Sequence, residues 1–173
     1  MGMDVFGKAP TNETGKYFRR NVWGWHPLAD LCTDLAPEIC KACEGWHDNS
    51  GDGLGKRASQ KLAKVLKEKL ADGSIAAYVA ARQASLAALQ KQPCPFCKGT
   101  GKNPKPLTKE SGQRVEMLVV SLLNAAASEK TGVCGVCEGT GHMHPMENGY
   151  HVDAEDVAEF AAFLEACGGF EIC

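Results

Sequence analysis

Two short cysteine motifs carry the clearest chemistry in the chain. Residues 94–101 read Cys-Pro-Phe-Cys-Lys-Gly-Thr-Gly, and residues 134–141 read Cys-Gly-Val-Cys-Glu-Gly-Thr-Gly. Two residues between the cysteines let both thiolates of a tight turn reach one cation, and two such turns supply the four sulfurs of a structural zinc site. The glycines that follow each pair can adopt positive φ, so the chain can wrap back beneath the metal. The sequence therefore predicts one zinc ion per chain, bound by Cys94, Cys97, Cys134 and Cys137.

The shared pattern, Cys-x-x-Cys-x-Gly-Thr-Gly, resembles the cysteine-rich zinc region of the DnaJ-type co-chaperones, whose motif is Cys-x-x-Cys-x-Gly-x-Gly. The resemblance covers residues 94–141 and implies a zinc knuckle with the same four cysteines as ligands. That family has four repeats and two zinc ions, whereas this chain has two complete repeats. The His-Pro-Asp signature of the J domain is also missing, because His26-Pro27 is followed by Leu28. Stimulation of a chaperone ATPase is therefore not implied.

Two further resemblances concern binding and the flanking segments. The two-repeat arrangement is similar to the small bacterial anti-TRAP protein, in which the same knuckle serves binding to another protein. Residues 23–28 and 168–173 resemble segments of uncharacterised bacterial and phage proteins, which implies no activity. The resemblance to anti-TRAP implies an interaction role. A catalytic zinc is not expected, because four thiolates leave a zinc ion no open coordination position.

A third Cys-x-x-Cys pair, Cys40 and Cys43, is followed by Gly45 but lacks the final Thr-Gly. With Cys32 and His47 it could complete a second metal site. The alternative is that Cys40 and Cys43 lie at the end of a helix as small buried apolar side chains. Spacing alone does not decide between these interpretations.

Histidines, carboxylates and tryptophans between residues 26 and 52 raise the alternative of a hydrolase. No nucleophile motif or phosphate-binding loop accompanies them, so we expect a protein that is not an enzyme. Tryptophans more often anchor a core than bind a ligand. The residues that could form such a functional site are Trp23, Trp25, His26, His47, Asp48 and Asp52.

Hydrophobic periodicity predicts the elements that position these residues. Apolar spacing favours helices at 27–35, at 37–42, at 56–71, at 74–90, from about 111 to Gly132, and from Asp153 to about 166. Residues 1–25 show no clear period and are interpreted as an irregular arm, and residues 170–173 as a short terminal strand. Charge is uneven: the helix at 56–72 is mainly basic and the helix at 153–166 is acidic. We expect either ordinary solvated faces or two opposed patches that meet a partner.

Composition sets the class of protein. The chain has 173 residues, of which 44% are hydrophobic and 23% charged, and its net charge is 19 − 21 = −2 with neutral histidines. That charge gives no general attraction to nucleic acid or to anionic membranes. No apolar run approaches the roughly 20 residues that span a bilayer, and residues 1–10 lack an apolar signal core. Nine cysteines cannot all pair internally, so we expect a cytoplasmic protein with metal-bound thiols.

These observations combine into one expected architecture. The fold is mainly α, with about five helices around one core, an inserted DnaJ-like knuckle and little β structure. Residues 1–93 form an arm and a helical region, residues 94–141 the knuckle with a helical insert, and residues 142–173 a C-terminal helix and tail that pack on the N-terminal region. The expected function is a protein-interaction module or small regulator that binds another protein or itself. The alternatives are a nucleic-acid-binding zinc protein that uses the basic helix 56–72, and the hydrolase near residues 26–52.

Overall fold

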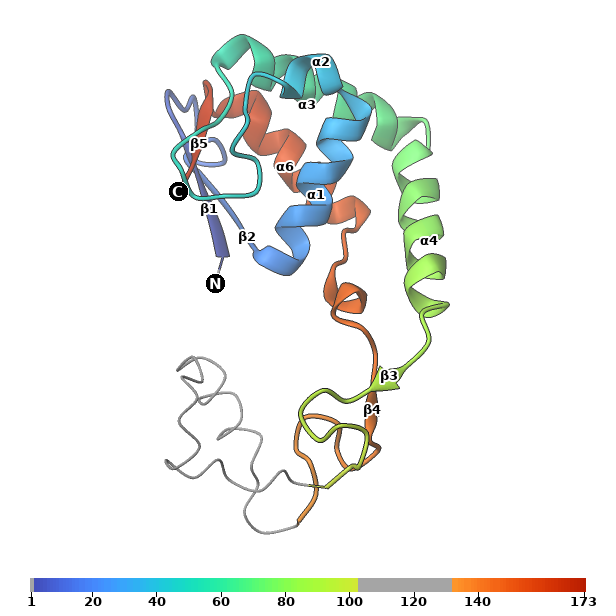
Figure 1. Ribbon diagram of the computed structural model, residues 1–173. Helices are drawn as coiled ribbons and strands as arrows, with labels where there is room; N and C mark the ends of the chain where they lie inside the picture. Colours follow the sequence, from blue (N-terminus) through green and yellow to red (C-terminus); the bar gives the residue numbers. More distant parts are fainter. Residues whose placement is uncertain (1, 103–131) are drawn as a thin grey trace, which may run out of the picture. The chain divides into compact units, whose positions relative to one another are not determined.

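The computed structural model describes residues 2–102 and 132–173, which form two compact units (Figure 1). Unit 1 comprises Met1–Ala88 and Asn148–Cys173, and unit 2 comprises Leu89–Glu147. Unit 1 therefore contains both ends of the chain, and unit 2 is an excursion between them. The helix expected between residue 111 and Gly132 lies outside the described residues, apart from Gly132 itself.

A three-stranded antiparallel sheet forms one side of unit 1. Strand β1 (Gly2–Gly7) lies in the middle, between β2 (Tyr17–Asn21) and β5 (Phe170–Ile172). Side chains alternate across the sheet, so that Met3 and Val5 of β1 are buried while Phe6 is 43% exposed. The expectation of an irregular arm over residues 1–25 is therefore wrong, because an alternating strand of this length shows no helical period. The terminal strand predicted at 170–173 is confirmed as β5.

Five helices are present in the described part of the chain. They are α1 (Val22–Leu35), α2 (Pro37–Cys40), α3 (Lys56–Ala71), α4 (Ser74–Ala87) and α6 (Ala154–Ala166). Helix α1 begins before the expected Pro27, because the Asn21 side chain accepts a hydrogen bond from the Gly24 amide at 2.9 Å and caps the helix. Asp153 caps α6 in the same way through the Asp156 amide. The predicted bounds of α3 are confirmed.

The core of unit 1 is an aromatic cluster between the sheet and the helices. Phe160 of α6 packs against Phe18 of β2, Trp25 of α1 and Phe170 of β5, with ring centroids 5.0 to 6.2 Å apart. All four side chains are buried, and Phe160 is fully inaccessible. At these distances, the attraction between neighbouring aromatic rings adds to the free energy gained by burying their apolar surface. Strands from both ends of the chain are therefore held against the same helix.

The basic helix and the acidic helix are neighbours in unit 1. Helices α3 and α6 pack directly on each other, and Lys67 forms an ion pair with Glu165 at 2.5 Å. Two other acidic side chains of α6, Asp156 and Glu159, pair with Arg20 of β2. Part of each helix's charge is therefore compensated within unit 1, and the alternative of two opposed patches stays a prediction.

The fold class is mainly helical, as expected. The prediction of little β structure understates the three-stranded sheet. The main core lies in unit 1, and the buried cluster of unit 2 consists of the four cysteines expected in the inserted segment. Among the helices that the structure describes, none combines the length and apolar character needed to cross a membrane.

Candidate metal centre

Unit 2 is framed by backbone pairing at both ends of its two octets. Strand β3 (Gln92–Pro93) pairs with β4 (His142–Met143) in antiparallel orientation just outside the cysteines. On the other side, Lys102 pairs with Val133 in an isolated bridge. Thirty-two residues, 102–133, separate the two octets in the sequence. The backbone pairing on both sides brings the octets together without a metal ion.

The two octets bond to each other in a reciprocal pattern. The amide of Cys94 donates to the Gly141 carbonyl at 2.7 Å, and the amide of Cys134 donates to the Gly101 carbonyl at 2.9 Å. Within each octet, a threonine hydroxyl donates to the carbonyl of the second cysteine, at 2.7 Å for both Thr100 and Thr140. The repeated threonine therefore braces the turn, a role that the sequence alone did not assign.

The final glycine of each octet is required by close approach as well as by its backbone angle. Gly101 and Gly141 have φ values of +69° and +72°, in the left-handed region. A Cβ atom on Gly101 would collide with the Gly139 carbonyl oxygen, and one on Gly141 would collide with that of Gly99. Only glycine therefore lets the two octets lie this close together.

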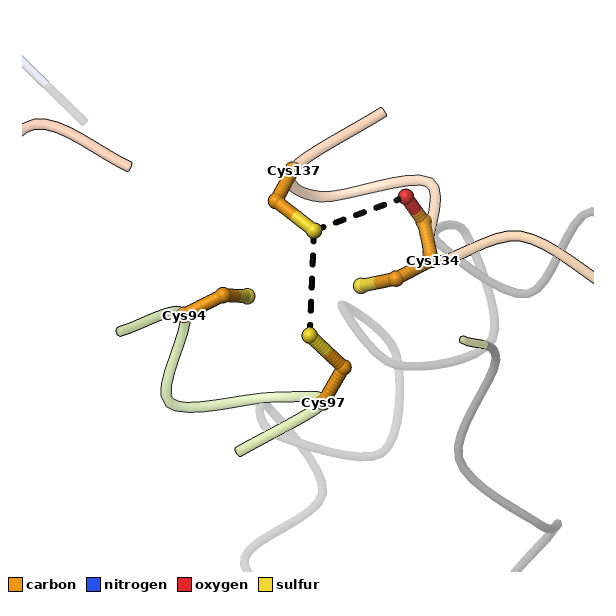
Figure 2. Close-up of side chains that lie close together, drawn as sticks. All are labelled: Cys94, Cys97, Cys134 and Cys137. Atoms are coloured by element: carbon orange, nitrogen blue, oxygen red, sulfur yellow. Dashed lines mark hydrogen bonds between the residues drawn. The ribbon is translucent and has the colours of Figure 1, made fainter. Parts of the chain in front are cut away.

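Four buried sulfurs converge between the octets, as Figure 2 shows. The sulfurs of Cys94, Cys97, Cys134 and Cys137 all lie within 4.8 Å of one another. Cys97 Sγ and Cys137 Sγ are 3.7 Å apart. Sulfurs at the corners of a tetrahedron, each about 2.3 Å from a central zinc ion, are separated by about 3.8 Å. The donor set and its spacing fit a metal ion, and the sequence prediction that these four residues come together is confirmed.

The electrostatics of the cluster also favour a bound cation. Burial raises the pKa of the Cys94 thiol to about 11. Burial acts in the same direction on Cys97, but hydrogen bonds from the Gly101 amide and from the neighbouring thiols lower the pKa of Cys97 to about 6. The Gly101 amide lies 3.2 Å from Cys97 Sγ. Four thiolates together in a buried site require a cation to compensate their charge, and metal binding releases their protons.

The third cysteine pair belongs to the core of unit 1. Cys40 and Cys43 are buried, and Cys40 Sγ donates to the Cys32 carbonyl at 3.3 Å. Burial raises the pKa of Cys40 to about 11 and, together with the Asp52 charge, that of Cys43 to about 12. Within the described residues, only the four cysteines of unit 2 form a group that could hold a metal ion. The burial expected of Cys40 and Cys43 as small apolar side chains is confirmed.

The histidines and carboxylates expected near a His/Asp site separate into two groups. His26 and His47 do come together, with their Nδ1 atoms 2.8 Å apart. Asp48 instead accepts from the Ser50 amide, and Asp52 accepts from the amides of Glu44 and Gly45, so both carboxylates stabilise a turn. The Gly45, Gly53 and Glu44 amides lower the pKa of Asp52.

The tryptophans divide in a similar way. Trp25 and Trp46 are buried in the core, while Trp23 is half-buried and packs on Tyr150 with ring centroids 4.7 Å apart.

The residue that sequence reasoning missed is Asp30, whose carboxylate lies 3.2 Å from His47 Nε2. Its signal was the four-residue spacing from His26, which places both side chains on one face of α1.

The comparisons with known proteins add no assignment. No protein-family model, no curated protein and no solved structure matches the chain. The functional argument therefore depends on the geometry of the two units.

The metal count tests the centre directly. We expect elemental analysis of the purified protein to give one zinc ion per chain. The structure has one four-sulfur group in its described residues, and Cys40 and Cys43 are buried among apolar side chains of unit 1. Serine in place of Cys94 or Cys137 should reduce the count toward zero. A ratio near two in the unaltered protein would contradict the assignment of Cys40 and Cys43.

A pair of glycine variants tests the close approach of the octets. Gly101→Ala places a Cβ against the Gly139 carbonyl. We therefore expect the chelator concentration needed to remove the zinc, measured with a chromophoric chelator, to fall at least about tenfold. Gly99→Ala is the matched control, because its φ is +80° but its Cβ would make only ordinary contacts. Both variants carry the left-handed backbone cost of about 1–2 kcal/mol. Equal effects would mean that close approach is unimportant.

Metal removal should affect the two units differently. The buried cluster of unit 2 consists of the four cysteines, with Phe96, Val136 and Met143 packed partly against it. We therefore expect its folding free energy to come largely from a bound metal. All three tryptophans lie in unit 1, so chelation should leave the melting transition detected by tryptophan fluorescence in place. The amide NMR signals of Gly99 and Gly139, in unit 2, should move to the chemical shifts of an unfolded chain. If chelation abolished the melting transition detected by tryptophan fluorescence, the two units would not be stabilised independently.

Proposed function

We propose that the protein is a protein-interaction module in which zinc stabilises unit 2 and plays no catalytic part. The observation that carries the proposal is the closed set of four buried thiols, because a zinc ion with four sulfur ligands has no position for water or substrate. The resemblance to DnaJ-type zinc knuckles, and to anti-TRAP, supports the same role. A rigid unit of this kind presents surface to a partner without chemistry of its own.

Helix α4 supplies the surface of unit 1 that best supports protein binding. Ile75 is its one buried residue, and Arg82 is the single charged residue between Ser74 and Ala87. Arg82 is itself engaged, since its guanidinium donates to the Tyr150 carbonyl at 3.1 and 3.2 Å. The exposed side is mostly alanine: Ala76, Ala77, Ala80, Ala81, Ala84 and Ala87. An uncharged exposed helix face of small side chains suits close packing against an apolar helix of another protein.

Nucleic-acid binding through α3 is the less supported alternative. Three of its lysines, Lys64, Lys67 and Lys69, form ion pairs with acidic side chains. With four thiolates and one zinc ion, the formal charge becomes −2 − 4 + 2 = −4. A chain with this balance has no extended positive field to attract phosphates.

The test combines partner capture with two sets of charge changes. Ala80→Glu with Ala84→Glu should weaken binding of the captured partner at least about tenfold, because two carboxylates would be buried in an apolar contact. Zinc content and melting temperature should not change, since both alanines are exposed. Light scattering on the purified protein distinguishes a second copy of the chain from a different partner.

The control set is Lys56→Glu, Arg57→Glu and Lys61→Glu on α3, which should leave that binding intact. If instead these three changes abolished binding to RNA or DNA whose affinity fell steeply with salt, the nucleic-acid alternative would be correct. Failure of both sets to alter any binding would refute the interaction surface on α4.

A further inference from the structure

A chain of three polar side chains lies on the exposed face of α1, outside the metal centre. His47 lies between two residues of that helix that are four positions apart: its Nδ1 is 2.8 Å from His26 Nδ1, and its Nε2 is 3.2 Å from Asp30 Oδ1. His47 itself comes from the loop between α2 and α3. One carboxylate and two imidazoles are thus connected in series.

The spacing between the imidazoles is that of a hydrogen bond rather than of two metal ligands. Donor and acceptor atoms in such bonds are typically about 2.7–3.2 Å apart. Two nitrogens bound to one tetrahedral zinc ion, each at about 2.0–2.1 Å, would lie about 3.3–3.4 Å apart. One imidazole therefore donates to the other.

The carboxylate decides which imidazole donates. Asp30 only accepts when ionised, so the proton of a neutral His47 must be on Nε2. His47 Nδ1 is then an acceptor, and His26 must carry its own proton on Nδ1. The remaining nitrogen of His26, Nε2, is left with a lone pair. It has no partner among the described residues, where no buried side-chain nitrogen is unpaired, so solvent reaches it.

Buried indoles hold this arrangement in place. Trp25 Nε1 donates to the Trp46 carbonyl at 2.6 Å, and Trp46 Nε1 donates to the Cys40 carbonyl at 3.1 Å. These bonds fix the backbone immediately before His47, and Trp25 immediately precedes His26. The His26 ring is flanked by Tyr150, whose ring centroid is 6.0 Å away and which packs on Trp23. The site therefore combines a preorganised base with an aromatic side suited to uncharged groups.

We propose that His26 is a nucleophilic imidazole for acyl groups on uncharged compounds, with His47 as its base and Asp30 as the positioning residue. His26 Nε2 forms the bond to the carbonyl carbon, and the leaving group departs with the electrons of the bond that breaks. The proton on His26 Nδ1 passes to His47 Nδ1. Asp30 stabilises the imidazolium that results, which is the triad logic with an imidazole in place of a hydroxyl. This site is separate from the interaction role of α4.

The probe is diethyl pyrocarbonate, whose carbonyl carbon is attacked by imidazole nitrogen with loss of ethyl carbonate. The reaction is run at least about one unit above 6.5, the ordinary pKa of an imidazole, where the neutral, nucleophilic form of an ordinary imidazole predominates. Mass spectrometry of the full chain should show His26 modified at least about tenfold faster than the exposed His142, His144 and His151. Equal rates for His26 and these three would overturn the proposal.

Variants of His47 and Asp30, and the tautomers of the two histidines, test whether the polar chain controls the reactivity of His26 or has only a structural role. His47→Gln and Asp30→Asn should each remove the rate advantage of His26, because glutamine cannot take up the proton and asparagine no longer selects the His47 tautomer. Asp34→Asn, an exposed change on the same helix, should retain it. Nitrogen-15 NMR of the unaltered protein should show His26 in the Nδ1–H form and His47 in the Nε2–H form. Finding both as Nε2–H would refute the relay without any variant.

Discussion

The pairing of β1 with β5 is the contact on which the rest of the structure depends. It brings residues 148–173 back into the unit formed by residues 1–88, and it places α6 against α3 and against the aromatic core. Because β1 and β5 are fixed in one sheet, unit 2 is an excursion of the chain that leaves unit 1 after Ala88 and returns to it at Asn148. The short β3–β4 ladder closes that excursion on itself before the cysteines are reached.

The metal centre shows how local and long-range requirements coincide. Each octet alone provides two sulfurs and a turn with left-handed residues, including Lys98 and Glu138 at φ values of 52° and 50°. Such conformations are costly outside glycine and persist where surrounding contacts enforce them. Here the reciprocal amide bonds of Cys94 and Cys134 hold the two turns together, and a bound cation would compensate the charge of the sulfurs. Unit 2, with little apolar burial of its own, takes its stability from this closure.

Helix α1 serves two purposes through its two faces. Its buried face places Trp25 and Leu28 in the core, and its other face presents His26 and Asp30 on either side of His47. The loop that carries His47 is held by Trp46 and by the Asp52 carboxylate. The same buried contacts that stabilise unit 1 therefore give the polar chain its geometry, which is why a surface feature can be preorganised without a deep pocket.

The sequence by itself determined which four cysteines come together, because the spacing of cysteines and glycines is a local property of a turn. It also determined α3, α4, α6 and the terminal strand, whose hydrophobic pattern is local as well. The strands β1 and β2 escaped sequence reasoning, since a five- or six-residue alternation is recognisable only when its partner strands are known. Only the tertiary structure decided that Lys67 of the basic helix pairs with Glu165 of the acidic helix, and that His47 lies between His26 and Asp30. Each of these depends on contacts between segments far apart in sequence, and the spacing of residues along one segment carries no information about them.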